Sequence, residues 1–346
     1  MLAQVLNIPR KFIKSLITNK VTAVFMTFLC TLITYTIYRI SISGFGNFIL
    51  TFALLLLGIL LKRSKAFPEN SAVVLNSFVI YVSLPALVLL TVPKLDFSDD
   101  IALLMFMPWL IVLLSVLLLM LLHKFFHWDK QTFAVLLLLV PLGNTSFFGI
   151  PMVQAYFGEQ AVAYAVIYDQ FGSFFALALY GSLILAIFDK NSKPFSLASV
   201  AHKVVTFPPF IALVVALLLS PFHLPEDYFN LLAPIAHTLV PVVMVAVGFQ
   251  LHLRIDKKYL TPFMIGLSIK MLVAPLFVVL LFSLFTIKGL IPQVIVFEAA
   301  MPPMISAGAL AIMADFHPRL TSAMLAYGIL LAFITLPLVR AFTIGI

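Results

Sequence analysis

Apolar segments alternate with short polar connections along nearly the whole chain. Each segment is close to the roughly 20 residues that cross a bilayer as a helix. The ten main segments are 47–62, 72–93, 101–122, 131–156, 159–188, 204–220, 229–250, 259–285, 290–314 and 318–343. Another apolar run, 21–40, precedes them. The pattern predicts an all-α polytopic membrane protein with ten membrane-spanning helices and one extra helix near the N-terminus.

Two interpretations compete for the run 21–40. It is either a retained membrane helix or a long signal sequence that is cleaved near the small residues Ser41, Ser43 and Gly44. Its length and the long basic leader before it favour a retained helix. The topology downstream is the same in both cases.

The basic residues predict the orientation of the chain in its membrane. Loops on one side, together with the leader, hold 16 of the 21 Lys and Arg residues. Basic loops stay in the cytoplasm. We therefore expect a cytoplasmic N-terminus, an external C-terminus and a place in a bacterial inner (plasma) membrane.

Composition narrows the class of protein further. With 63% hydrophobic residues, 10% charged residues and a mean hydropathy of +1.16, a soluble domain is excluded. The net charge of +8 is scattered between apolar segments, which argues against a nucleic-acid partner. The single cysteine, Cys30, excludes an intrachain disulfide.

No sequence pattern indicates catalysis. The histidines have no metal-ligand spacing, and no glycine-rich phosphate loop is present. We expect neither an enzyme nor a bound metal or cofactor. There is also no room for an ATPase domain, so a proton or sodium gradient would have to drive any transport.

One stretch, 140–157, breaks the pattern of a plain membrane helix. Prolines and glycines there remove backbone donors and loosen the helical hydrogen bonds. Lipid cannot satisfy the freed groups, so the stretch must lie in protein or line a wet cavity. The unusual residues are Pro141, Gly143, Asn144, Thr145, Ser146, Gly149 and Pro151.

The two halves of the chain resemble each other. Pro85 aligns with Pro241 at an offset of 156 residues, and Gly149 aligns with Gly308 at an offset of 159. Halves of five helices each must have opposite orientations, so we predict an inverted repeat. The predicted division is 1–45 (leader and extra helix), 46–188 (first repeat), 189–203 (cytoplasmic linker) and 204–346 (second repeat).

Each half breaks at the corresponding place. Gly143 and Asn144 interrupt the fourth predicted helix, and Pro302 and Pro303 interrupt the ninth. Paired breaks of this kind mark the binding site in many secondary transporters. The alternative is that prolines simply kink two membrane helices. The match between the two clusters favours a binding site.

The chain resembles the auxin efflux carrier family, and in particular its short bacterial members. The resemblance covers nearly all of 47–346, and the brief linker fits the short form. The stretches that carry it are 75–89 (LNSFVIYVSLPALVL), 143–159 (GNTSFFGIPMVQAYFGE), 165–172 (AVIYDQFG), 298–311 (EAAMPPMISAGALA) and 327–337 (YGILLAFITLP).

The resemblance implies a fold similar to the bile-acid sodium symporters, with elevator-type alternating access. Predicted helices one, two, six and seven would form a scaffold, and three to five with eight to ten a moving transport domain. The broken helices would cross at mid-membrane, where Asn144 would contact a substrate carboxylate beside Pro302 and Pro303. Bacterial relatives are associated with malate or malonate. Where plant carriers have a serine this chain has Val88, which argues against auxin as substrate.

The residues around Asn144 suit an anion. Its amide offers two donors, and half-helix N-termini add backbone N–H groups. We expect substrate contacts from Gly143, Asn144, Thr145, Tyr168, Pro302 and Pro303. Thr145, Tyr168 and Gln170 are equally at home in helix packing.

Three ionisable residues lie deep in predicted helices. Asp169, Glu298 and Lys270 each need a partner or water at that depth. We expect Lys270 to neutralise one acid and the other to carry a coupling proton, with Asp169 the first candidate and Glu298 the second. The alternative is a structural ion-pair network.

Three weaker candidates complete the set. Asn76 and Ser83 share one face of the second predicted helix and would either line the scaffold side of the site or bond to a neighbouring helix. We expect His237 to be buried and satisfied.

The sequence thus predicts a secondary transporter for a small organic anion, a mono- or dicarboxylate, embedded in lipid and able to form a homodimer. The second hypothesis is a sensor with a transporter fold that binds a ligand without net transport. Its weakness is that this chain has only short loops for signal output. An intramembrane enzyme is a distant third.

Overall fold

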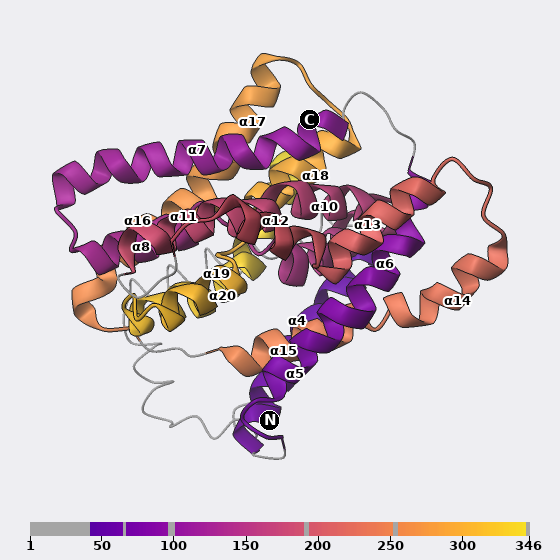
Figure 1. Ribbon diagram of the computed structural model, residues 1–346, viewed down its shortest axis with the longest axis horizontal. Helices are drawn as coiled ribbons and strands as arrows, with labels where there is room; N and C mark the ends of the chain where they lie inside the picture. The colour runs from indigo at the N-terminus through magenta and orange to yellow at the C-terminus, as the bar shows by residue number, and fades with distance from the viewer. Residues whose placement is uncertain (1–41, 65–66, 96–100, 190–193, 252–254, 344–346) are drawn as a thin grey trace.

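A computed structural model describes residues 42–64, 67–95, 101–189, 194–251 and 255–343 (Figure 1). Within these ranges the protein is built of helices, and its one β-bridge pairs two single residues. The predicted all-α class is therefore confirmed. The run 21–40 and part of the predicted linker lie outside the described residues, as does Ser41 of the alternative cleavage site, whereas Ser43 and Gly44 lie at the start of α4.

One group of helices, which we name the panel, packs mainly on itself. Its central contact is between α4 and α15, and α6 packs on α13 and α14. The panel consists of α4 (Ile42–Ser64), α5 (Ser71–Phe78), α6 (Leu84–Thr91), α13 (Pro208–Leu219), α14 (Glu226–Ala236) and α15 (Leu239–Gln250).

The second group, which we name the bundle, contains the remaining long helices. Here α18 packs on α7, α10, α17 and α20, while α8 packs on α11, α19 and α20. The bundle consists of α7 (Ile101–Phe126), α8 (Lys130–Leu139), α9 (Ile150–Phe157), α10 (Val162–Tyr168), α11 (Ser182–Phe188), α16 (Leu260–Ser268), α17 (Ala274–Leu284), α18 (Leu290–Ala299), α19 (Ile305–Met313) and α20 (Pro318–Thr343).

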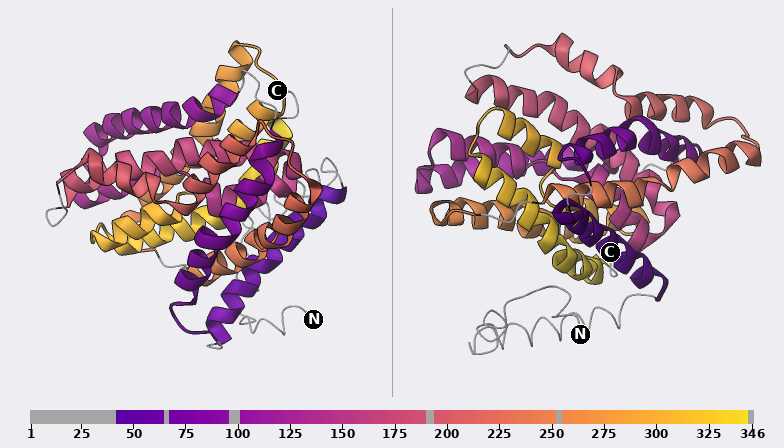
Figure 2. Two further views of the ribbon diagram at one scale, coloured as in Figure 1. Left: turned by 45° about the vertical axis from the view of Figure 1, so that its right-hand side comes forward. Right: turned by 90° about the horizontal axis from the view of Figure 1, so that it is seen from below.

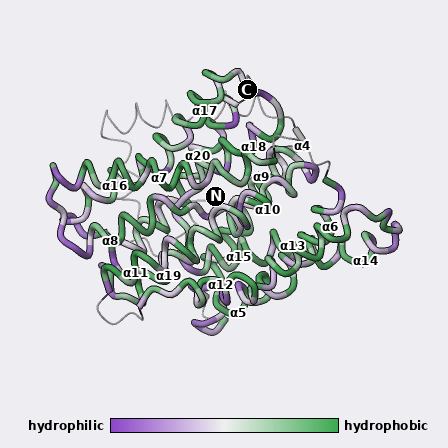
Figure 3. The backbone as a smooth tube through the Cα atoms, turned by 45° about the horizontal axis from the view of Figure 1, so that its top comes forward, coloured by the Kyte–Doolittle hydropathy of each residue, from purple (hydrophilic) through white to green (hydrophobic). Residues whose placement is uncertain are grey.

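The panel helices run obliquely to those of the bundle (Figures 1 and 2). The two groups meet mainly where α4 packs on α9 and where α10 packs on α6. Hydrophobic residues cover most of each helix, and hydrophilic residues gather at helix ends and connections (Figure 3). This distribution is the one expected of helices surrounded by lipid.

Six described helical stretches are long and apolar enough to cross a membrane. They are 71–94, 101–126, 159–188, 226–250, 257–284 and 318–343. Several contain π-turns, among them Asp169–Phe174 and Ile269–Val273, which interrupt the regular hydrogen bonds without ending the helix. The total number of spans and the inverted repeat stay predictions.

The region around the predicted linker differs from the expectation of a loop. Helix α12 (Leu197–Val205) begins within it, capped by the Ser196 side chain, which accepts from Ser199 N at 3.4 Å. Its buried residues Val200 and Val204 pack on side chains of the bundle and panel. A bend of 66° then separates α12 from α13.

A candidate substrate site where two broken helices meet

The first broken helix stops in the bundle at Leu139. The chain then runs without helix through Gly143 and resumes in a π-turn, Thr145–Gly149, that leads into α9. Gly149 N donates to the Asn144 carbonyl at 2.9 Å, so the turn is closed immediately after the break. The prolines and glycines thus interrupt the helix where the sequence predicts.

The second broken helix stops at Ala299 and resumes at Ile305. Between these ends the two breaks pair with each other through their backbones. Asn144 N donates to Pro302 O at 2.8 Å, and Met304 N donates to Leu142 O at 3.0 Å. Gly143 and Pro303 form an antiparallel bridge. The freed backbone groups therefore find partners inside the protein, as a membrane setting requires.

The pairing brings together four of the predicted site residues, Gly143, Asn144, Pro302 and Pro303. Helix α20 passes directly behind them at Gly328, where a Cβ would lie 2.7 Å from Pro303 Cδ. A glycine is thus needed for this close approach. The predicted roles in substrate binding stay predictions.

The side chain of Asn144 is held at the crossing with an unused donor. The residue is 2% exposed, and its Nδ2 has no hydrogen-bond partner among the described residues. The half-helices that start at Thr145 and Ile305 add backbone N–H groups of positive character. A buried donor without a partner costs free energy unless a ligand or water uses it. The crossing therefore presents a hydrogen-bond donor that no described residue uses.

Asp169 has partners for both of its oxygens. Thr145 Oγ1 donates to Oδ1 at 2.6 Å, and Gln170 Nε2 donates to Oδ2 at 2.8 Å. All three residues are buried, as is the adjacent Tyr168. The carboxylate thus ties the start of the π-turn at Thr145 to α10, in line with a structural role.

Glu298 is different, because neither of its oxygens has a hydrogen-bond partner in the described structure. It is fully buried, and its carboxylate lies so close to Gly149 that any Cβ there would collide with it. Lys270, 2% exposed, reaches the other end of the break, where a Cβ on Gly143 would lie 3.0 Å from Nζ. Two glycines of the first break thus make room for two ionisable side chains.

No described carboxylate lies within 4 Å of Lys270 Nζ, so the expected ion pair is not closed in this conformation. Lys270 and Glu298 both line a cavity of about 10 Å³. Gly143, Thr145 and Tyr168 also contribute to its wall. That volume is about the size of one water molecule. The predicted coupling roles stay predictions.

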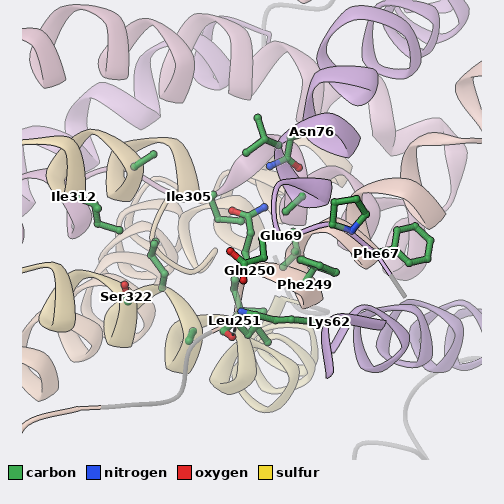
Figure 4. A pocket seen from close by; sticks show the side chains of 18 residues that line it. Lys62, Phe67, Glu69, Asn76, Phe249, Gln250, Leu251, Ile305, Ile312 and Ser322 are labelled. Carbon is green, nitrogen blue, oxygen red and sulfur yellow. Dashed lines mark hydrogen bonds between the residues drawn. The ribbon is translucent and has the colours of Figure 1, made fainter. Parts of the chain in front are cut away.

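A much larger pocket of about 910 Å³, which we name the vestibule, separates the panel from the bundle (Figure 4). Its walls come from α4, α5 and α15 on one side and from α19 and α20 on the other. The lining residues used below are Lys62, Glu69, Asn76, Gln250, Ile305 and Ala309. Figure 4 shows Asn76 at one end and Lys62 at the other, with Glu69 and Gln250 between them.

The weaker candidates fall in different places. Asn76 lines the vestibule, whereas Ser83 bonds to Thr238 Oγ1 at 2.7 Å and therefore joins two panel segments. The prediction for His237 is wrong. Its side chain is 54% exposed and its Nε2 lies 3.4 Å from Glu159 Oε1, because the residue sits where α14 ends and not inside a helix.

The opposite end of the interface between panel and bundle is filled by aromatic rings. We name this contact the aromatic seal: Phe48 and Phe52 of α4 pack on Phe333 of α20 with ring centroids 5.6 and 4.9 Å apart. Tyr156 and Phe148 join it, at 5.7 Å from Phe48 and 5.4 Å from Phe333 respectively. Among the described residues, no ring pair across the interface lines the vestibule.

A polar network that the sequence does not reveal joins three loops of the bundle. His317 contacts Asp129 Oδ1 at 2.9 Å and the Tyr259 hydroxyl at 3.0 Å. Asp129 also caps α8 by accepting from Gln131 N and Thr132 N. Burial raises the pKa of Asp129, but the hydrogen bonds from Thr132 and His317 outweigh it and bring the pKa to about 2.

The long apolar helices and the paired breaks define an integral, multi-pass membrane protein. The chain belongs to the membrane transport protein family, that of the auxin efflux carriers, whose family model matches residues 43–340. The predicted resemblance is thereby confirmed. The family is one of membrane transporters and not of enzymes.

Two archaeal relatives are also described as transporters. An uncharacterized transporter of Methanocaldococcus jannaschii is 28% identical over 258 residues, which cover 72% of this chain and 82% of the relative. An uncharacterized transporter of Methanothermobacter thermautotrophicus is 25% identical over 288 residues, which cover 82% of this chain and 93% of the relative.

Proposed function

We propose that this protein is a secondary transporter for a small organic anion that binds at the crossing of the two broken helices. The observation that carries the proposal is the buried Asn144 amide, whose donor is unused at the point where the breaks pair. Gly143, Thr145, Pro302 and Pro303 form the surrounding wall. A carboxylate supplies the acceptor that this donor lacks.

Access to the site alternates between the two ends of the interface. In this conformation the vestibule opens at the end where Lys62 stands in the last turn of α4, and the aromatic seal closes the other end. By the positive-inside rule, the open end faces the cytoplasm and the C-terminus lies outside. The panel acts as the scaffold, and the bundle moves against it in an elevator-type step. This assignment agrees with the way each group packs on itself.

Glu298, rather than Asp169, is the residue that carries the coupling proton in this proposal. Both oxygens of Asp169 accept hydrogen bonds, whereas those of Glu298 accept none. Lys270 supplies a nearby positive charge. Glu298→Gln should therefore abolish uptake driven by a pH gradient while substrate exchange continues. Full pH-driven uptake by this variant would remove Glu298 from the role.

The test of function is uptake of labelled mono- and dicarboxylates into proteoliposomes under proton and sodium gradients. Asn144→Ala should reduce uptake at least tenfold, because the loss of one charge-assisted hydrogen bond costs about 1.5–3 kcal/mol. Asn230→Ala, at an exposed position of α14, is the matched control and should leave uptake unchanged.

Two outcomes would contradict the proposal. Unchanged uptake by Asn144→Ala would mean that the anion binds elsewhere. Ligand binding without flux under every gradient would favour the sensor hypothesis, in which the same crossing binds a ligand but moves nothing across the membrane.

A further inference from the structure

We infer that Asn76 is a specificity-determining residue that binds the substrate from the panel side. It donates a hydrogen bond to a second acceptor group at the end of the substrate opposite its carboxylate. The inference rests on the proposed function and adds to it a requirement on the substrate: a carboxylate at one end and another hydrogen-bond acceptor at the other.

The polar side chains around Asn76 in the second predicted helix are satisfied locally, and Asn76 is not. Ser77 Oγ donates to Val73 O at 2.9 Å, and Ser83 Oγ bonds to Thr238 Oγ1 at 2.7 Å. Asn76 Oδ1 is covered by protein yet has no partner among the described residues. The side chain is half-buried and lines the vestibule, so its amide nitrogen is the group presented to the pocket (Figure 4). A polar side chain left without partners in a membrane protein marks a functional position.

The vestibule is lined both by Asn76 and by Ile305, the first residue of the half-helix that follows the second break. Ile305 lines the pocket and follows Pro303 by two residues, so their Cα atoms are at most about 7.6 Å apart. Asn76 belongs to the panel, whereas Ile305 and Asn144 belong to the bundle. A ligand bound between the crossing and the vestibule would thus meet a donor of the bundle on one side and a donor of the panel on the other.

The charged groups of the vestibule are Lys62, at the end opposite Asn76, and Glu69, between the two (Figure 4). Lys62 Nζ donates to Leu251 O at 3.3 Å, which binds the end of α4 to the chain after α15. Glu69 repels carboxylates and lies in the connection before α5. Asn76 is therefore the donor best placed to discriminate between ligands whose carboxylate has already reached the crossing.

The experiment measures binding to the full chain in lipid nanodiscs. The probes are sets of ligands of equal length, from three to five carbons: a monocarboxylate, the dicarboxylate and its monoamide. The monoamide separates a second acceptor from a second charge. The variants are Asn76→Leu, which keeps the volume and removes the donor, and Ser77→Ala as a control on the same turn.

For the wild type, the dicarboxylate or the monoamide should bind more tightly than the monocarboxylate of equal length. Asn76→Leu should reduce that tighter binding at least tenfold and change monocarboxylate affinity less than twofold. Ser77→Ala should change neither. An equal loss for all ligands, or no loss for any, would overturn the inference. So would a wild type that binds the monocarboxylate as tightly as the other two, although the proposed function would then stand. If no carboxylate binds the wild type, both the inference about Asn76 and the proposed function are contradicted.

Discussion

The two ends of the interface between panel and bundle are built on different principles. At one end, rings from α4 and α20 fill the space with specific aromatic contacts. At the other, the vestibule leaves about 910 Å³ between the same two helix groups, and polar contacts join loops within the bundle or segments within the panel. One end of the interface is thus held closed by packing, and the other is free to admit a ligand.

Removing the centre of the aromatic seal should have the largest effect on this difference between the closed and the open end. Phe333 is 9% exposed and touches three other rings, so Phe333→Ala should cost about 3–5 kcal/mol of stability. In a double variant that also carries Phe48→Cys, the thiol introduced at position 48 should become accessible to reagents added at the sealed end. Chemical unfolding and labelling in nanodiscs measure the two effects.

The control for this prediction lies on the same helix. Phe342 is 75% exposed, so Phe342→Ala should change stability by less than about 0.5 kcal/mol. Equal losses from both variants would mean that ring packing is not what closes this end.

Filling the open end should stop transport without unfolding the protein. Ala309 is exposed to the vestibule, and Ala309→Trp would occupy much of the space between α19 and the panel. Uptake should fall at least tenfold, while the midpoint of thermal unfolding moves by less than about 2 °C, equivalent to about 1–2 kcal/mol for a chain of this size.

The control is Ala198→Trp, at an exposed position of α12 outside the vestibule. This variant should transport normally. Normal uptake by Ala309→Trp would show that the substrate does not pass through the vestibule.

The smallest change in stability is expected at the open end, where loops of the bundle contact one another. Asp129→Asn keeps an oxygen that can cap α8 but removes the charge that accepts from Thr132 Oγ1 and contacts His317, and should cost about 1 kcal/mol. The pKa of Asp129 is held at about 2, below its usual value near 3.9, so its carboxylate stabilises the fold above about pH 4 and loses this effect as the pH falls toward 2.

Unfolding measured between pH 5 and pH 2 checks this prediction, because the wild type should lose its advantage over Asp129→Asn across that range. Asp256→Asn, which removes an exposed ion pair with Arg319, should cost less at neutral pH. A constant difference between wild type and Asp129→Asn down to pH 2 would contradict the assigned role of the carboxylate.

The sequence is informative where local chemistry decides the structure. Proline and glycine between 141 and 151 cannot continue a regular helix in lipid, so the first break is predictable from composition alone. That Gly143 meets Pro303 follows only from the resemblance to the auxin efflux carriers, which implies that the two broken helices cross. The long apolar helices follow from hydropathy.

Long-range packing is what the sequence does not reveal. Nothing local indicates that Glu298 lies on Gly149, that Lys270 lies on Gly143, or that Gln170 occupies one oxygen of Asp169. The network of His317 joins residues far apart in the chain, and His237 is exposed because a helix ends there. These positions depend on how whole helices are placed, which residue spacing does not encode.

The pairing of the two breaks through main-chain atoms has a consequence for how such a protein can change over generations. Asn144 N and Met304 N bond to carbonyls and not to side chains. Substitutions beside the crossing can therefore alter the shape and polarity of the pocket while the joint between the half-helices persists. New ligand preferences can arise here in single steps, without the architecture having to be rebuilt each time.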